Sequence, residues 1–145
     1  MPTKVIFFKE TDGTVPFLDW LRDLKEKKAV AKCIAMVELL EQFGPKLRRP
    51  HADILRDGIH ELRTRVGRVQ YRLLYFFHEQ LAVISHGFIK PGAKVEAKEI
   101  DRAVGNREVF RKAPNEHTFQ EDFDHDQKKT NQNHGRRGNP SSPFR

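Results

Sequence analysis

Arginines recur at positions of the same parity in two consecutive segments of this sequence, residues 59–66 and the stretch from 68 to 77. Side chains of an extended strand point alternately to two faces, so residues two apart share a face. The arginines that share a face in this way are Arg63 and Arg65 in the first segment, and Arg68 and Arg72 around the second. Antiparallel pairing would bring several guanidinium groups together, and their mutual repulsion favours a bound anion. A phosphodiester backbone fits, because guanidinium binds phosphate oxygens in a bidentate manner and keeps its charge.

A second group of residues closes the next apolar segment. His86 and Phe88 have the same strand parity and should project together, and Lys90 follows them. An imidazole can transfer protons near neutral pH, and a phenylalanine can stack on an unpaired base. Two alternatives stay open on sequence alone: the arginines are ordinary solvent-facing residues paired with nearby carboxylates, and Phe88 belongs to the core.

RNA carries its own nucleophile, the 2′-hydroxyl, so a site that cleaves RNA needs a proton acceptor, a proton donor and cations near the phosphate. Such a site needs no metal and no cofactor. His86 and Lys90 are the candidate proton-transfer groups, and Lys90 qualifies if nearby arginines depress its pKa. Arg65, Arg68 and Phe88 are candidate RNA-binding residues. The histidine spacing predicts no metal site.

These residues need a sheet to hold them, and the apolar patterns predict one. Residues 4–9 read as an opening strand, 14–27 and 29–43 as two helices, and 46–57 as a connection. Residues 59–66, 69–77 and 81–88 predict an antiparallel meander, and 95–110 a final helix. The chain therefore predicts an α+β domain: a small antiparallel sheet, two N-terminal helices packed on one side, and a C-terminal helix.

The composition limits the classes of protein to which the chain can belong. It has 145 residues and a formal net charge of +7, all of it within residues 1–112, which form the expected domain. Such a charge attracts polyanions. Residues 113–145 are polar and are expected to be a disordered tail. With Cys33 as its single cysteine, and no apolar run long enough for a signal peptide or a membrane span, we expect a cytoplasmic protein with no membrane partner.

Several short blocks, in this order and spacing, resemble a known family. They are Gly58-Ile-His-Glu-Leu-Arg63, Tyr71-Arg-Leu-Leu-Tyr-Phe76, His86-Gly-Phe-Ile-Lys90 and Glu99-Ile-Asp-Arg-Ala103. Together they resemble the RelE/ParE superfamily of toxins, most closely its phage-derived Gp49-like, HigB-type branch. The resemblance covers about residues 3–112. Relatives often carry a Lys-Lys pair after the phenylalanine, whereas Pro91 follows Lys90 here.

The resemblance implies a toxin of a type II toxin–antitoxin system that cleaves mRNA on the ribosome and inhibits translation. It implies an oligomeric complex with a cognate antitoxin, commonly a helix-turn-helix DNA-binding protein. By position in the blocks, Arg63 and Arg72 would hold the scissile phosphate, with His86 and Lys90 completing the catalytic set. Alanine at either arginine should abolish toxicity with little effect on folding. Two alternatives remain: a ParE-like inhibitor of DNA gyrase, and an RNA-binding module without catalysis.

Overall fold

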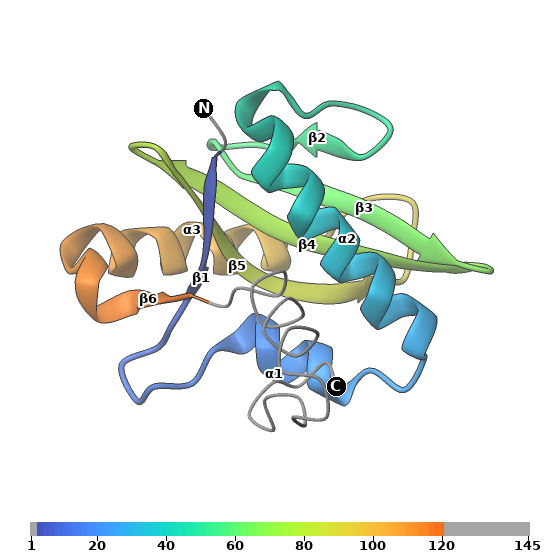
Figure 1. Cartoon of the computed structure of the whole chain (residues 1–145), viewed down its shortest axis with the longest axis horizontal. Coiled ribbons are helices and arrows are strands. Elements are labelled where there is room, and N and C mark those ends of the chain that lie inside the picture. Colours follow the sequence, from blue (N-terminus) through green and yellow to red (C-terminus); the bar gives the residue numbers. More distant parts are fainter. Residues whose placement is uncertain (1–2, 121–145) are drawn as a thin grey trace, which may run out of the picture.

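A computed structural model describes residues 3–120 of the chain, which form a mixed α+β fold of three α-helices and a six-stranded sheet (Figure 1). The α+β class expected from the sequence is confirmed. The elements in order are β1 (Lys4–Phe8), α1 (Pro16–Asp23), α2 (Lys27–Phe43), the short 3-10 helix η1 (Gly44–Lys46), β2 (Ala52–Ile54), β3 (His60–Val66), β4 (Val69–His78), β5 (Leu81–Lys90), α3 (Ala97–Lys112), the 3-10 helix η2 (Pro114–His117) and β6 (Thr118–Phe119).

The sheet has the strand order β2-β3-β4-β5-β1-β6. Its centre is the antiparallel meander β3-β4-β5 that the sequence predicts. The sheet is not wholly antiparallel, however, because β1 pairs with β5 in the parallel direction. This corrects the expectation. Parallel neighbours need a long crossover connection, and here α1, α2 and the first strands of the meander lie between β1 and β5 in the chain.

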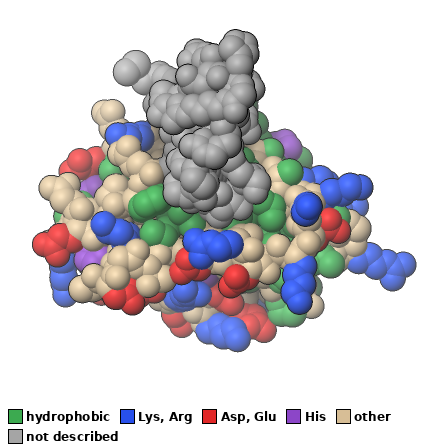
Figure 2. All heavy atoms as spheres, turned by 60° about the horizontal axis from the view of Figure 1, so that its bottom comes forward, with side chains coloured by type: hydrophobic (Ala, Val, Ile, Leu, Met, Phe, Trp, Pro, Cys, Tyr) green, Lys and Arg blue, Asp and Glu red, His purple; other side chains and the backbone are tan. Residues whose placement is uncertain are grey.

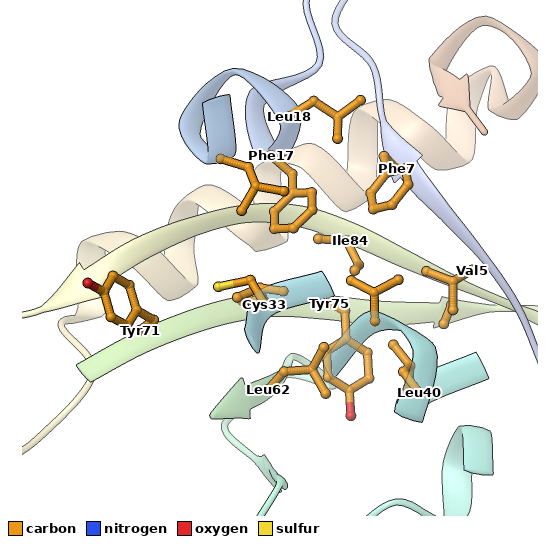
Figure 3. Close-up of a cluster of buried hydrophobic side chains, with 14 of the residues drawn as sticks. Val5, Phe7, Phe17, Leu18, Cys33, Leu40, Leu62, Tyr71, Tyr75 and Ile84 are labelled. Atoms are coloured by element: carbon orange, nitrogen blue, oxygen red, sulfur yellow. The ribbon is translucent and has the colours of Figure 1, made fainter. Parts of the chain in front are cut away.

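One face of the sheet is covered by α1 and α2, and we call it the helix-hairpin face. Its core joins Phe7 of β1, Phe17 of α1, Cys33 and Leu40 of α2 and Tyr75 of β4 (Figure 3). Cys33 is fully buried, and burial raises the pKa of its thiol to about 12. A thiol in that state is protonated at neutral pH and serves as a small core residue.

The opposite face is covered by α3, and we call it the α3 face. Ile100, Ala103 and Phe110 of α3 pack there on Leu74 and Phe76 of β4. The helices therefore lie on both sides of the sheet (Figure 1). Residues 91–96 connect β5 to α3, and Glu99 in the first turn of α3 contacts His86 in the middle of β5, where the candidate site begins.

Gly87 of β5 lies against the indole ring of Trp20 in α1. A Cβ atom at this position would clash with that ring. We expect Gly87→Ala to displace the indole and lower the free energy of unfolding by about 1–3 kcal/mol. Gly105→Ala is the matched control, because a Cβ there meets nothing within 4 Å. That exposed position is within α3, so alanine should stabilise by about 1 kcal/mol. Urea unfolding of both variants checks the opposite signs.

The fold continues beyond residue 112, the end of the domain expected from the sequence. Residues 114–117 form η2, and β6 pairs antiparallel with β1 through Phe119 and Thr118. His117 is buried, and its Nδ1 lies 2.7 Å from the carbonyl oxygen of Lys9. The remainder of the expected tail, residues 121–145, lies outside the described residues. Within residues 3–120, no helix is long and apolar enough to cross a membrane.

Candidate active site

The register of the meander places the predicted site residues in rows across three strands. Arg63 of β3 lies opposite Arg72 of β4, which lies opposite Phe88 of β5. Residues paired in this way point to the same face of a sheet. The next row toward the β3–β4 turn consists of Arg65, Gln70 and Lys90. Both rows lie on the α3 face, beyond the row that meets the first turn of α3, so a basic group gathers at this end of the sheet.

A buried carboxylate lies beneath these cations. Glu61 is 5% exposed and Arg72 is 3% exposed, and Arg72 Nε lies 3.1 Å from Glu61 Oε1. The contact is an ion pair without the alignment of a hydrogen bond. Burial raises the pKa of Glu61, although Arg72 and Arg63 oppose that shift, and burial lowers the pKa of Arg72. Desolvation of both groups thus makes each dependent on the other for its charge.

The two central arginines differ in their surroundings. Arg72 donates from Nη1 to the backbone oxygen of Tyr71 at 3.1 Å and to Gln70 Oε1 at 3.3 Å, so its guanidinium is held inside the sheet. Arg63 has a side chain that is 34% exposed, and its nearest carboxylate contacts are at 3.9 Å to Glu61 and 4.0 Å to Asp53. Of these two arginines, Arg63 is therefore the one whose guanidinium can bind a ligand without breaking close contacts within the protein.

Lys90 lies at the rim of the same group. Its Nζ donates to the backbone oxygen of Gly92 at 2.6 Å. Partial burial lowers the pKa of Lys90, and the charges of Arg72 and Arg63 add to the shift while Glu61 opposes it. The direction is the one that brings an ammonium group closer to proton transfer at neutral pH. Arg65 and Arg68 are exposed.

A β-bulge turns His86 toward α3. Leu74 pairs with His86 and the next residue of β4 pairs with Ile84, so Ser85 is the extra residue of β5. Both Ser85 and His86 then contact α3, which regular alternation would not allow. Ser85 Oγ lies 2.8 Å from His86 Nδ1 and accepts a hydrogen bond from Asn106 Nδ2 at 2.9 Å. The bulge therefore builds a polar link between the sheet and the helix.

The imidazole of His86 is neutral at physiological pH. Its Nε2 lies 3.0 Å from Glu99 Oε1, and the ring is 1% exposed. Burial, with a smaller contribution from Arg102, lowers the pKa of His86 from 6.5 to about 3. Since Ser85 Oγ already accepts a hydrogen bond from Asn106, its own hydroxyl can donate a hydrogen bond to Nδ1. The ring proton then lies on Nε2 and faces the carboxylate of Glu99.

This buried neutral histidine predicts a loss of stability in acid. Between pH 6.5 and about 3 the unfolded chain binds a proton at His86 that the folded chain does not. The free energy of unfolding should therefore fall as pH is lowered through this window, by up to about 1.4 kcal/mol per pH unit from this group. Urea unfolding from pH 7 to pH 4 should show a shallower fall in His86→Gln than in the wild type. Parallel curves would refute the contribution of His86.

Comparison with known protein families identifies the family of this chain. Residues 19–108, well over half of the chain, match the family described as Phage derived protein Gp49-like (DUF891). The chain belongs to this family. The match runs from α1 into α3 and includes every residue of the two basic rows. No curated protein matches the chain.

In this Gp49-like protein, the residues predicted from the sequence fall into two groups. Those at the surface are Arg63, Arg65, Arg68 and Lys90, and those inside are Arg72, His86 and Phe88. Phe88 is 9% exposed and packs in the core of the α3 face, with its ring centroid 5.9 Å from that of His86. The two rings do project together, as their strand parity predicts. Phe88 is a core residue in this structure and no open platform for a base.

The sequence predicted Glu61 only as a possible partner of solvent-facing arginines, and it predicted no role for Asp53 in the site of the Gp49-like protein. Glu61 pairs with Arg72, and Asp53 on β2 lies within 4.0 Å of Arg63 and bonds to Arg49 at 2.8 Å. The signal for Glu61 was present, since it shares the parity of Arg63. Asp53 gave no such signal, because its strand was expected to be a connection. No cluster of three or more potential metal ligands lies within residues 3–120.

Proposed function

We propose that this Gp49-like protein is the toxin of a toxin–antitoxin system and acts as a metal-independent endoribonuclease on mRNA that is held on the ribosome. The observation that carries the proposal is the pair of basic rows at one end of the sheet. Arg63 and Lys90 are within reach of a phosphodiester, and the buried Glu61–Arg72 pair fixes the base of the site. Membership of the family is consistent with a toxin.

The proposed reaction uses the 2′-hydroxyl of the RNA as its nucleophile. Its proton passes to solvent water, its oxygen forms a bond to the adjacent phosphorus, and the bond from phosphorus to the 5′-oxygen of the next nucleotide breaks. The products are a 2′,3′-cyclic phosphate and a free 5′-hydroxyl. Arg63 stabilises the charge on the non-bridging oxygens, as a preorganised cation does. Lys90, with its lowered pKa, is placed to give a proton to the leaving oxygen.

The buried members of the predicted catalytic set have supporting roles in this proposal. Arg72 holds the carboxylate of Glu61, and Glu61 in turn lies 3.9 Å from Arg63. His86 is neutral and fixed between Ser85 and Glu99, so it ties the end of β5 to α3. We therefore treat Arg72 and His86 as positioning residues, and Arg63 and Lys90 as the groups that contact RNA.

The proposal is tested in cells and in a reconstituted translation system. Induction of the wild type should arrest growth and produce new 5′ ends within the reading frame of a reporter mRNA, mapped by primer extension. The cuts should be absent from untranslated message, and co-expression of the cognate antitoxin should prevent them. Growth arrest with intact mRNA would overturn the nuclease and favour a ParE-like inhibitor of DNA gyrase.

One observation favours a second candidate, an RNA-binding module without catalysis. The imidazole of His86 and the guanidinium of Arg72 are both buried, so the surface offers cations more readily than a proton acceptor. Such a module would bind RNA with a steep dependence on salt and leave it intact. Intact RNA recovered after binding, with or without ribosomes, would separate this function from the nuclease.

A further inference from the structure

The β3–β4 hairpin carries a second group of cations at its tip, next to the start of α2. In Figure 1 this tip extends past α2, and in Figure 2 Lys and Arg side chains protrude at the same end of the molecule. Lys32 Nζ donates to the backbone oxygen of Arg65 at 3.0 Å, so helix and hairpin are in contact. Lys28 lies one helical turn before Lys32, and Arg68 follows Gly67 in the turn. We call Lys28, Lys32, Arg65 and Arg68 the hairpin-tip surface.

The charges of the hairpin-tip surface are not neutralised within the fold. Elsewhere in residues 3–120, five arginines form ion pairs with carboxylates, namely Arg22, Arg49, Arg56, Arg63 and Arg72, and four do not, namely Arg48, Arg102, Arg107 and Arg111. The four exposed cations of the tip form none within residues 3–120. The acidic residue closest in sequence, Glu26, caps α2 by accepting from the backbone nitrogen of Lys28. This end of the molecule therefore offers an uncompensated positive surface.

Two exposed apolar side chains lie on the helix-hairpin face, which α2 with Lys28 and Lys32 covers, whereas the side chain of Arg65 points to the α3 face. Val69 is 40% exposed and pairs with Val66, while Ile89 is 49% exposed and pairs with Tyr71. Trp20 of α1 meets Tyr71 edge-on at 6.4 Å. Tyr71 is buried and Trp20 is half-buried, so the exposed apolar groups here are aliphatic. Cations near exposed apolar groups suit a single-stranded nucleic acid, whose phosphates and unstacked bases are both available.

Arg65 belongs both to the candidate active site and to the hairpin-tip surface, so the two are continuous. It lies two residues along β3 from Arg63, about 7 Å at the usual rise of a strand. That separation is comparable to the distance between successive phosphates of an extended strand. We propose that the hairpin-tip surface binds the single-stranded RNA that continues from the scissile phosphodiester, leading it around the turn to Lys32 and Lys28. This inference rests on the proposed function and extends it to the length of RNA that is bound.

The test compares two double variants of the full chain. Lys28→Gln/Lys32→Gln removes two cations of the tip and keeps a helix-compatible side chain. Lys46→Gln/Lys112→Gln is the matched control, since both lysines are exposed and Lys46 lies beyond the opposite end of α2. The probes are fluorescein-labelled 2′-O-methyl oligouridylates of about 5 and about 15 nucleotides, which span the range of site sizes of single-strand binders. Because the 2′-hydroxyl is blocked, anisotropy reports binding without cleavage.

We expect the tip variant to bind the long oligonucleotide about tenfold to a hundredfold more weakly at low salt. The slope of log affinity against log salt should decrease by about 1.4, because two phosphate contacts are lost. The tip variant should bind the short oligonucleotide as the wild type does. The control variant should bind both oligonucleotides as the wild type does. Urea unfolding verifies that both variants are folded.

The outcomes for the two proposals are separable. Equal binding of the long probe by the tip variant and the wild type would overturn the hairpin-tip surface, whether or not the protein cleaves mRNA. Failure of the wild type to bind the long probe would also overturn the proposal that the hairpin-tip surface binds RNA. A polypeptide partner would then be the better candidate for this surface. If binding depends on the tip but the wild type cuts no mRNA, the result would support RNA binding by the hairpin-tip surface and overturn the proposed nuclease activity.

Discussion

Arg63→Ala is expected to reduce mRNA cleavage about 10²–10³-fold and to leave the fold intact. Loss of one preorganised donor at a charged transition state has an effect of this size. The fold should survive because the side chain of Arg63 is 34% exposed and its carboxylate contacts, at 3.9 and 4.0 Å, are long. Glu61 retains Arg72 as its closer partner when Arg63 is removed. The cleavage rate in a reconstituted translation system, beside a urea unfolding curve, measures both parts of the prediction.

Arg22→Ala is the matched control for this experiment. Arg22 is also an exposed arginine with a carboxylate partner, 3.0 Å from Asp19, but it lies on α1 and on the other face of the sheet. Its replacement should change neither stability nor cleavage by a measurable amount. Full activity in Arg63→Ala would sink the assignment of the phosphate site. Equal losses in both variants would mean that net charge, and not the position of the guanidinium, controls the activity.

The rows of the candidate site followed from strand periodicity in the sequence. Alternation along residues 59–66 put Arg63 and Arg65 on one face, and the short turns at Gly67 and Glu79 implied antiparallel neighbours. The structure confirms the meander, because in a half-buried sheet a slip of one residue would expose the core face. The side of the sheet on which a residue lies is therefore readable from the sequence when the strands are consecutive.

Non-local features of the fold were not readable in this way. The parallel pairing of β1 with β5 joins segments separated by most of the domain, and no local pattern encodes it. The bulge at Ser85 adds one residue to β5 without a glycine or proline to mark it. Short β2 was expected to be a connection, since three residues are too few to show a period. Its pairing with β3 is what brings Asp53 to the site.

Burial was the property that the sequence predicted least well. Arg63 and Arg72 have the same residue type and share a face, and either was expected to be replaceable by alanine with little effect on folding. The structure separates them, because Arg72 of β4 has a paired residue on both sides, Arg63 and Phe88, while β2 pairs with β3 only as far as Leu62 and leaves Arg63 with a paired residue on one side. Side chains on both flanks cover a long aliphatic stem, and a residue with one flank open is covered less. Arginine in the centre thus becomes part of the interior.

Arg72→Ala is consequently expected to lower the free energy of unfolding by about 3–5 kcal/mol. The change leaves the carboxylate of Glu61 buried at 5% exposure, with Arg63 at 3.9 Å as its remaining close cation. An uncompensated buried charge has a penalty of this size. Glu61→Ala should have a comparable effect for the reciprocal reason. Urea unfolding at pH 7 measures both, and a loss below about 1 kcal/mol in either would contradict a buried pair.

The paired replacement Glu61→Leu/Arg72→Met separates stability from function. Apolar side chains of similar volume remove both buried charges, and such replacements are often neutral or stabilising. We expect the double variant to unfold within about 1 kcal/mol of the wild type, with a large coupling energy in the double-mutant cycle. We expect the double variant not to cleave mRNA, because Arg63 then has no buried carboxylate to orient it against the scissile phosphate. A stable double variant that still cleaves would show that the pair serves the fold alone, and that the exposed cations Arg63 and Lys90 are sufficient for the reaction.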